Sequence, residues 1–413
     1  MPNGFPISGQ LHKLWGGPPG PRQTPWSACP GIQRFDSSRQ ERDEGVPRGP
    51  GGPPHPVASH RDSENYAALS LSVPTITGIG SVSPYGTLSG AIDALPLQPR
   101  QILRWPTRGV RTAFLVEPFR PTDVVPGLKT RRLDRLSVWA LVASSIAIRD
   151  AGLDLGQLDR SRIGVVCATG LGCIELTEAF LQSALDNTWS QTDPIIFPET
   201  LGNAPASHVA RCLDLSGPNV TVSSSGQAGE CALLHAASLL RHGQADRIIV
   251  IAGDTLTRTA YEWCEVAGLL SSACLGTTPA EEGCGFIPSE GVTAMVLECE
   301  SARAMRPYAR LRSVCLAAGK DPLAATRQEL ANLSGSPAVR CSVFDRSTAA
   351  VIVEALGEAA TIVIEGQVGR GLGDSGALFR LAASLHATPA GSLLLLTGIP
   401  SERGFATLLV EAP

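Results

Sequence analysis

From about residue 73 onwards, hydrophobic and polar positions follow two alternating periods. Short apolar runs such as Arg162–Gly170 and Arg247–Asp254 are typical of buried strands. Residues 130–152 and 231–246 instead carry apolar positions at the three- and four-residue spacing of a helix. Because strands and helices alternate, the pattern predicts an α/β fold in which parallel sheet layers are covered by helices.

The same alternation continues after about Pro307. The pattern predicts strands, helices and a closing strand pair, in the order 308–319, 346–359, 361–369, 373–387, 392–399 and 404–413. This order echoes that of the preceding segment. We therefore expect two related α/β halves, 71–300 and 301–413, of which the second is shortened and divergent.

Residues 1–70 have a different composition. They are rich in Pro, Gly, Arg and Ser and show no lasting periodicity. Such a segment cannot bury enough apolar surface to fold alone. We expect a disordered extension, or an artefact of the assigned start.

Composition and charge exclude several classes of function. The net charge of −4 implies no strong attraction to nucleic acid or to a membrane surface. No apolar run approaches the roughly 18 residues of a membrane span, and no apolar signal core opens the chain, so a cytoplasmic location is expected. The eleven cysteines form no CxxC pair, which argues against zinc and iron–sulfur sites. No metal and no cofactor is expected.

Five segments, taken in order, resemble the β-ketoacyl synthase (condensing enzyme) family, which has a thiolase-like fold. One match alone would be weak, whereas five in sequence are specific. The fourth contains an apolar strand, a sharp glycine turn (SSSGQAG), a helical pattern and a second strand. The segments are 77–86, 131–153, 164–175, 217–255 and 283–298.

The resemblance implies chemistry on acyl thioesters carried by acyl carrier protein. In that family a cysteine at a helix N-terminus takes the acyl group, because the helix dipole favours its thiolate and backbone N–H groups hold the oxyanion. Two histidines polarise the malonyl thioester. Here the cysteine position falls on Gly226, or on Gln227 if the turn carries one extra residue. Arg370 stands where one histidine would be, and residues 340–348 offer no histidine in place of the other.

A first hypothesis is therefore a non-catalytic partner. The family includes chain-length factors, which lack the cysteine, often carry glutamine there, and pair with an active ketosynthase. Gln227 resembles that substitution. The resemblance then implies a ketosynthase-like subunit of type II polyketide or fatty-acid-type biosynthesis, inactive alone. Its partners would be a catalytic ketosynthase, or a second copy of itself, and acyl carrier protein, with the strand near residue 220 at the subunit interface.

Three alternatives remain open. The chain could be a condensing β-ketoacyl-[acyl-carrier-protein] synthase with displaced catalytic residues, using Cys231 or Cys264. It could use a serine of the turn, with Ser225 as the nucleophile, although no base is visible beside it. It could also be a non-enzymatic scaffold or a decayed homologue. Glu290, in the Ser-Glu-Gly turn of the fifth segment, is expected to be structural, since such an acid usually accepts backbone N–H bonds.

Overall fold

The fold is taken from a computed structural model of the chain. It describes the ranges 73–93, 100–101, 111–186, 192–224, 227–271, 286–299, 307–317, 339–343, 352–354, 360–364, 376–397 and 405–412. The extension expected at residues 1–70 lies outside these ranges, as does most of the helix expected at 346–359.

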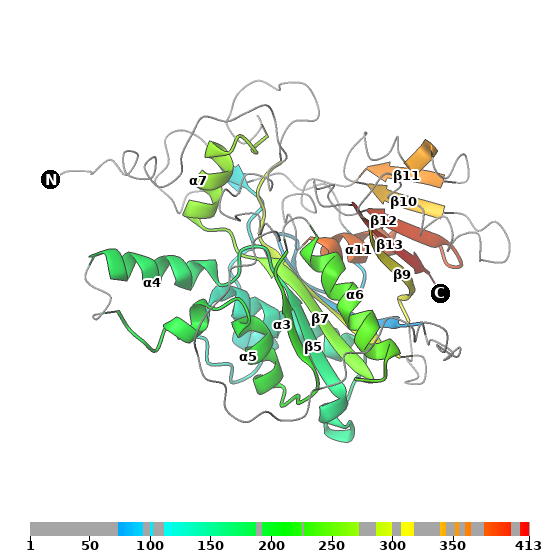
Figure 1. The fold of residues 1–413 in the computed structure, drawn as a ribbon, viewed down its shortest axis with the longest axis horizontal. Coiled ribbons are helices and arrows are strands. Elements are labelled where there is room, and N and C mark those ends of the chain that lie inside the picture. The colour runs from blue at the N-terminus through cyan, green and yellow to red at the C-terminus, as the bar shows by residue number, and fades with distance from the viewer. Residues whose placement is uncertain are drawn as a thin grey trace, which may run out of the picture. The chain divides into compact units, whose positions relative to one another are not determined.

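Most described strands belong to one 11-stranded sheet in the order β11-β10-β12-β13-β9-β1-β8-β7-β5-β6, with β2 paired to β1 (Figure 1). The strands up to residue 298 are β1 (Thr75–Ser83), β2 (Gly86–Ser89), β5 (Ile163–Ala168), β6 (Asn219–Val222), β7 (Arg247–Asp254) and β8 (Gly291–Glu298). The later ones are β9 (Ala309–Ala317), β10 (Val339–Val343), β11 (Ala360–Ile364), β12 (Leu393–Thr397) and β13 (Phe405–Glu411). A separate small sheet joins β3 (Arg100–Gln101) to β4 (Thr112–Ala113).

The two halves repeat one topology, which confirms the prediction of two related α/β halves. Leaving β2 aside, each half contributes five strands, and in each the spatial order is third, second, fourth, fifth, first. The second strand of each half pairs parallel with the third and fourth, whereas the fourth and fifth pair antiparallel. The halves meet where β1 pairs with β9.

The sheet is mixed: the parallel pairs predicted from the alternation of strands and helices are present, and antiparallel pairs stand beside them. The closing pair shows the reason: β12 ends at Thr397 and β13 begins at Phe405, and so short a separation along the chain suits antiparallel neighbours, whereas a parallel crossover needs about a dozen residues or more. The predicted pairing of these two segments is confirmed. The central strands β5 and β7 are parallel and almost fully buried, as their apolar runs predicted.

Helices cover both faces of the sheet. On one face lies α3 (Arg135–Asp150), in which 12 of 16 residues are buried, together with α5 (Ala204–Cys212). The helix α3 approaches β1 closely, because a Cβ on Gly80 would lie 2.2 Å from the Ala143 carbonyl oxygen. The Thr-Gly-Ile-Gly sequence of β1 is thus a requirement of packing.

On the other face lie α6 (Ala228–Arg241) and α11 (Ala377–His386), which hold equivalent places in the two halves. The two helices contact each other near their first turns. A Cβ on Gly229 would lie 2.7 Å from the Cβ of Ala377, so only glycine allows this approach. The start of α6 is therefore buried against the second half.

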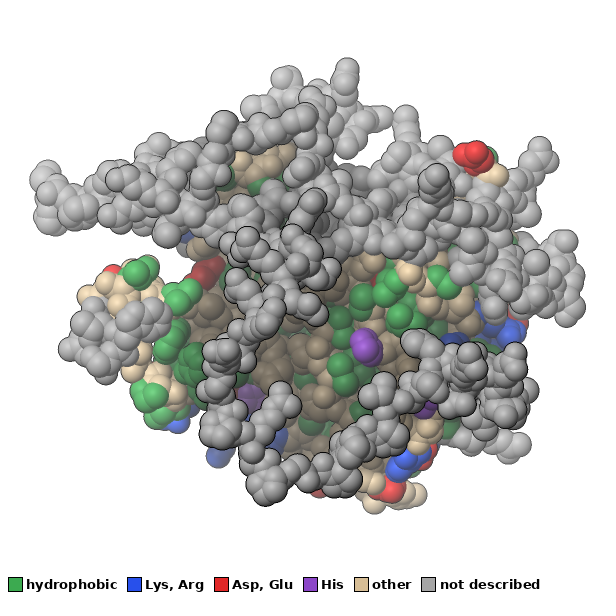
Figure 2. Space-filling model, in the orientation of Figure 1, with side chains coloured by type: hydrophobic (Ala, Val, Ile, Leu, Met, Phe, Trp, Pro, Cys, Tyr) green, Lys and Arg blue, Asp and Glu red, His purple; other side chains and the backbone are tan. Residues whose placement is uncertain are grey.

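The remaining helical segments lie at the border of the sheet. They are α2 (Pro121–Val124), α4 (Ile174–Asp186), α7 (Arg258–Val266) and the 3-10 turns η1 (Leu155–Gln157), η2 (Arg160–Arg162) and η4 (Phe197–Thr200). In Figure 1, α4 extends away from the sheet, and hydrophobic side chains gather at this end of the face in Figure 2. No described helix combines the length and apolarity needed to cross a membrane.

Candidate functional site

The turn between β6 and α6 is the region in which the sequence predicts a lost nucleophile. The strand β6 ends at Val222, Ser223 is exposed and Ser224 is partly buried. Ser225 and Gly226, two of the predicted positions, lie outside the described residues. The helix begins at Ala228, with Gln227 between it and Gly226.

Gln227 is the residue that precedes α6. It is buried, with φ −149° and ψ 26°, and its side chain does not cap the helix. A side-chain amide is a poor nucleophile compared with a thiolate, and it has no group that ionises near pH 7. A side chain of this type at this place can hold a conformation or contact a neighbour, but it cannot carry an acyl group.

Glu230 and Arg380 form a buried ion pair that sequence reasoning missed. Glu230 lies in the first turn of α6 and Arg380 on α11, and Nη2 donates to Oε1 at 2.8 Å. Both side chains are less than 5% exposed. Arg380 also donates from Nη1 to the Thr397 carbonyl oxygen at 2.7 Å. The pair connects the two halves beside the predicted site.

A signal for this pair exists in the sequence. Glu230 follows the glycine turn inside AGECALLHAASLL, and Arg380 is the only charged residue of ALFRLAASL. An acid and a base, each in a largely apolar stretch of two helices at equivalent places in two related halves, point to a buried pair.

Glu230 also changes the electrostatics of the helix start. The N-terminus of a helix carries a partial positive charge that would favour a thiolate. A carboxylate in the first turn opposes this effect. The nearest described thiol shows the result: burial raises the pKa of Cys231, the Glu230 charge raises it further, and a hydrogen bond with Ser224 lowers it only in part.

The described histidines lie at other places. His208, on α5, is buried and bonded through Nε2 to Glu199 at 2.6 Å, while Arg211 donates to its Nδ1 at 2.8 Å. His235, His242 and His386 are exposed, towards or at the C-terminal ends of α6 and α11. Arg370, the predicted replacement of a catalytic histidine, lies outside the described residues.

Glu290 holds three segments of the first half together. Its side chain is fully buried, and it accepts the Val116 N–H at 3.2 Å and the Leu256 N–H at 3.1 Å. Arg135 pairs with it at 3.2 Å and with Glu175 at 3.0 Å. The carboxylate is thereby matched by main-chain donors and a guanidinium, an arrangement that orders loops and leaves no reactive group.

Asp254, at the end of β7, orders the glycine loop that follows β5. Its Oδ1 accepts the Thr169 hydroxyl at 2.5 Å and the Leu171 N–H at 2.9 Å, and both carboxylate oxygens accept the Gly170 N–H at 3.1 Å. The loop is one of the segments that carried the resemblance, and its conformation is fixed by this single carboxylate. The Gly-Asp ending of the strand was visible in the sequence without revealing this contact.

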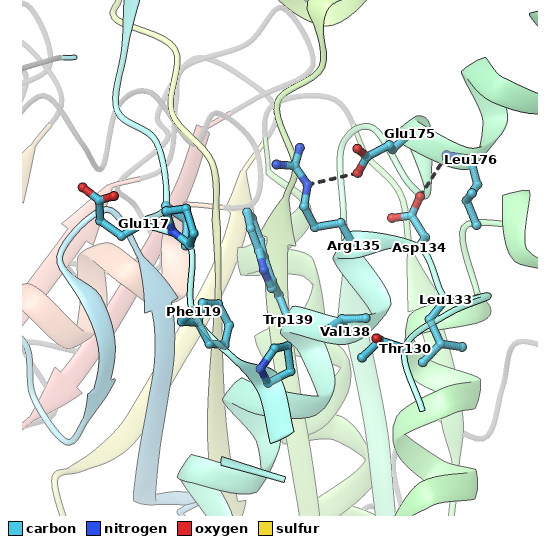
Figure 3. A pocket seen from close by; sticks show the side chains of 13 residues that line it. Glu117, Phe119, Thr130, Leu133, Asp134, Arg135, Val138, Trp139, Glu175 and Leu176 are labelled. Carbon is cyan, nitrogen blue, oxygen red and sulfur yellow. Dashed lines mark hydrogen bonds and ion pairs between the residues drawn. The ribbon is translucent and has the colours of Figure 1, made fainter. Parts of the chain in front are cut away.

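A cavity of about 490 Å³ lies on the α3 side of the sheet (Figure 3). Phe119 and Trp139 line it, and Arg135 reaches across it to Glu175. Asp134 accepts the N–H groups of Leu136 and Leu176, so it caps α3 and fixes the start of α4. Burial raises the pKa of Asp134 in spite of these bonds. These charged groups already bond to one another or to the main chain.

A family model of the β-ketoacyl synthase N-terminal domain matches residues 96–303, half of the chain. The chain belongs to the β-ketoacyl synthase family. Among curated relatives, 3-oxoacyl-[acyl-carrier-protein] synthase 2 of Vibrio cholerae is 26% identical over 239 residues, or 54% of this chain and 57% of that protein. The Staphylococcus aureus protein of that name is 28% identical over 246 residues, which are 55% of this chain and 60% of that protein. The matches span about three fifths of these relatives.

Solved structures place the chain among ketosynthase folds. The ishigamide ketosynthase/chain length factor is 24% identical with a TM-score of 0.61, covering 82% of this chain and 99% of that one. A β-ketoacyl synthase from Burkholderia phymatum is 18% identical with a TM-score of 0.67, covering 83% and 100%. A type II polyketide ketosynthase in complex with its acyl carrier protein is 20% identical with a TM-score of 0.66, and the match covers 83% of this chain and 99% of that one. The thiolase-like fold predicted for the β-ketoacyl synthase family is confirmed.

Proposed function

We propose that this chain is a non-catalytic, chain-length-factor-like subunit. It pairs with a cysteine-bearing ketosynthase and supports acyl-carrier-protein-dependent chain extension in polyketide or fatty-acid-type biosynthesis. The relatives support the substrate class, since they include 3-oxoacyl-[acyl-carrier-protein] synthases and a ketosynthase/chain length factor.

The start of α6 carries this proposal. Gln227 precedes the helix, and Glu230 places a buried carboxylate in the first turn, paired with Arg380. A condensing site needs a thiolate, and N–H donors that stabilise an oxyanion, at such a position, and a nearby negative charge disfavours both the thiolate and the oxyanion. The helix start thus differs from a condensing site in electrostatics as well as in the replaced nucleophile.

The alternative of displaced catalytic residues is the second candidate. Cys231 lies one turn along the helix, within reach of Ser224. Its raised pKa leaves little thiolate near pH 7, and reactive cysteines generally have a lowered pKa. Cys264 is buried in the core on α7. These environments favour the non-catalytic proposal over this alternative.

The edge strand β6 supports pairing with another subunit. Among the described strands β6 has one neighbour, β5, and its outer edge is open. Its residues, Asn219–Val222, are exposed or half-buried and include no charge, proline or bulge that would protect the edge. Such an edge is suited to a strand from a partner. We propose Glu290 as a structural anchor in this assembly.

Reconstitution with purified proteins tests the proposal. The full-length chain, malonyl- and acyl-loaded acyl carrier protein, and a cysteine-bearing type II ketosynthase are assayed separately and together. We expect no acyl adduct and no 3-ketoacyl product from the chain alone. Adding the chain to the ketosynthase should increase product formation and alter product length.

The other possible results of the reconstitution each support a different function. Carbon–carbon bond formation by the isolated chain would establish the displaced-site alternative. An adduct mapped by mass spectrometry to Ser223, Ser224 or Ser225 would establish serine chemistry. If the rate and the products of the ketosynthase do not change when the chain is added, the chain is a non-enzymatic scaffold or a decayed homologue. The matched control is the ketosynthase with its catalytic cysteine replaced by alanine, which should give no product in any mixture.

A further inference from the structure

One end of the molecule exposes an unusual number of large apolar side chains. We call α4 together with residues 192–201 the arm. Of the nine large hydrophobic residues that are exposed among those the structure describes, five lie in the arm: Leu181, Leu185, Ile195, Phe197 and Leu201. Leu185 is 80% exposed, and Ala184 is the one buried residue of α4. Exposed patches of this kind mark interaction surfaces.

The arm is also acidic. It contains five carboxylates and neither Lys nor Arg: Glu175, Glu178, Asp186, Asp193 and Glu199. Glu175 and Glu199 pair with Arg135 and His208, which lie outside the arm. Asp186 and Asp193 are exposed and bond only to Gln182 and to the Ile195 N–H among the contacts seen. Their negative charge therefore borders the apolar patch.

The arm is continuous with the open edge of the sheet. The Thr177 hydroxyl donates to the Thr200 carbonyl oxygen at 3.2 Å, which joins α4 to η4. Glu199 on η4 bonds to His208 on α5 at 2.6 Å. The Asn219 amide of β6 donates to the Ala206 carbonyl oxygen of α5 at 3.2 Å. A partner that pairs with β6 thus meets the same side of the molecule as the arm.

We propose that the arm docks on the ketosynthase partner and that its charge selects this different chain over a second copy. This inference rests on the proposed function. In a twofold homodimer built on β6, both copies would bring an acidic arm to one interface, and like charges oppose such a contact. A partner whose apolar surface is bordered by Arg or Lys matches both the patch and its charge. The arm is then a specificity element.

Opposite salt dependences test the inference. Sedimentation equilibrium of the full-length chain should show self-association that strengthens as salt is added, because screening weakens the repulsion between arms. Binding to the ketosynthase used in reconstitution should weaken with salt. The double variant Asp186→Asn/Asp193→Asn should self-associate about tenfold more tightly and bind the ketosynthase several-fold more weakly.

Matched variants separate the arm from general surface effects. Asp123→Asn/Glu354→Gln removes two exposed acids elsewhere and should change neither equilibrium. Leu185→Ser should weaken ketosynthase binding, whereas Val266→Ser, at an 89% exposed residue of α7, should not. A tight homodimer unaffected by salt and by the arm variants would overturn the inference. If the wild-type chain fails to bind the ketosynthase, the proposed function fails, while self-association still reports on the arm.

Discussion

Glu290 and Glu230 are both buried carboxylates paired with an arginine, yet their surroundings differ. Glu290 receives two main-chain N–H groups, and its arginine, Arg135, is partly exposed and shared with Glu175. Glu230 pairs with Arg380, which is as deeply buried as its partner and comes from the other half of the molecule. The first group ties loops within one half, whereas the second ties the halves together.

The two carboxylates therefore stabilise different parts of the molecule. Glu290 lies in a turn that resembles the β-ketoacyl synthase family, and its contacts order the frame. Glu230 and Arg380 lie close to the predicted nucleophile position, in the first turn of α6 and on the equivalent helix of the second half. There a buried ion pair occupies the contact between the two helices.

Breaking the Glu230–Arg380 pair gives the largest expected effect. Arg380→Met should lower the free energy of unfolding by about 3–5 kcal/mol, because it leaves a buried carboxylate without its guanidinium. Replacing both residues by methionine should recover most of this loss, since an apolar pair needs no desolvated charge. Urea unfolding followed by circular dichroism measures both.

The double variant is the control for lost packing volume. If Arg380→Met and the double variant lose equal stability, then packing, not charge, explains the effect. If Arg380→Met loses less than about 1 kcal/mol, the site tolerates the loss of the guanidinium beside Glu230 and the contrast with Glu290 disappears.

Glu290→Gln should have a smaller effect, about 2 kcal/mol, in the same measurement. An amide oxygen can still accept one of the two N–H groups, while Arg135 keeps Glu175 and contact with solvent. Arg135→Met should cost a similar amount. If Glu290→Gln lowers the free energy of unfolding by more than Arg380→Met does, the expected order is wrong, and Glu290 contributes more to stability than the Glu230–Arg380 pair.

The sequence predicted the frame far better than it predicted the contacts. Apolar periodicity located β5, β7, α3 and α6 because each is a long segment with one dominant period. The repeated halves followed from the order of such segments. The antiparallel direction of β8 could not be predicted in this way, because a buried apolar strand has the same pattern in either direction.

Apolar periodicity alone does not show which distant residues meet, although the isolated charges of Glu230 and Arg380 mark them as candidates for a buried pair. Glu230 and Arg380 are 150 residues apart, and Asp254 meets Thr169 across 85 residues. The exposure of the arm was equally hidden, since Leu181 and Leu185 share the helical spacing that elsewhere marks a buried face. Glu290 was predictable because its turn has its own signature.

The smallest effect concerns the reactivity of Cys231. Burial and the Glu230 carboxylate raise the pKa of its thiol, so removing the carboxylate should lower that pKa and increase the thiolate fraction at pH 7. Glu230→Gln should speed alkylation of Cys231 by iodoacetamide about two- to fivefold, and Glu290→Gln should not. The gain should shrink as the pH rises towards the thiol pKa, because the thiol of Cys231 is then ionised in both proteins.

Peptide mapping by mass spectrometry gives the alkylation rate of Cys231. Buried Cys167, whose pKa burial raises to about 12, reports any unfolding. An unchanged rate at Cys231 with Cys167 protected would show that Glu230 does not govern the electrostatics of the helix start.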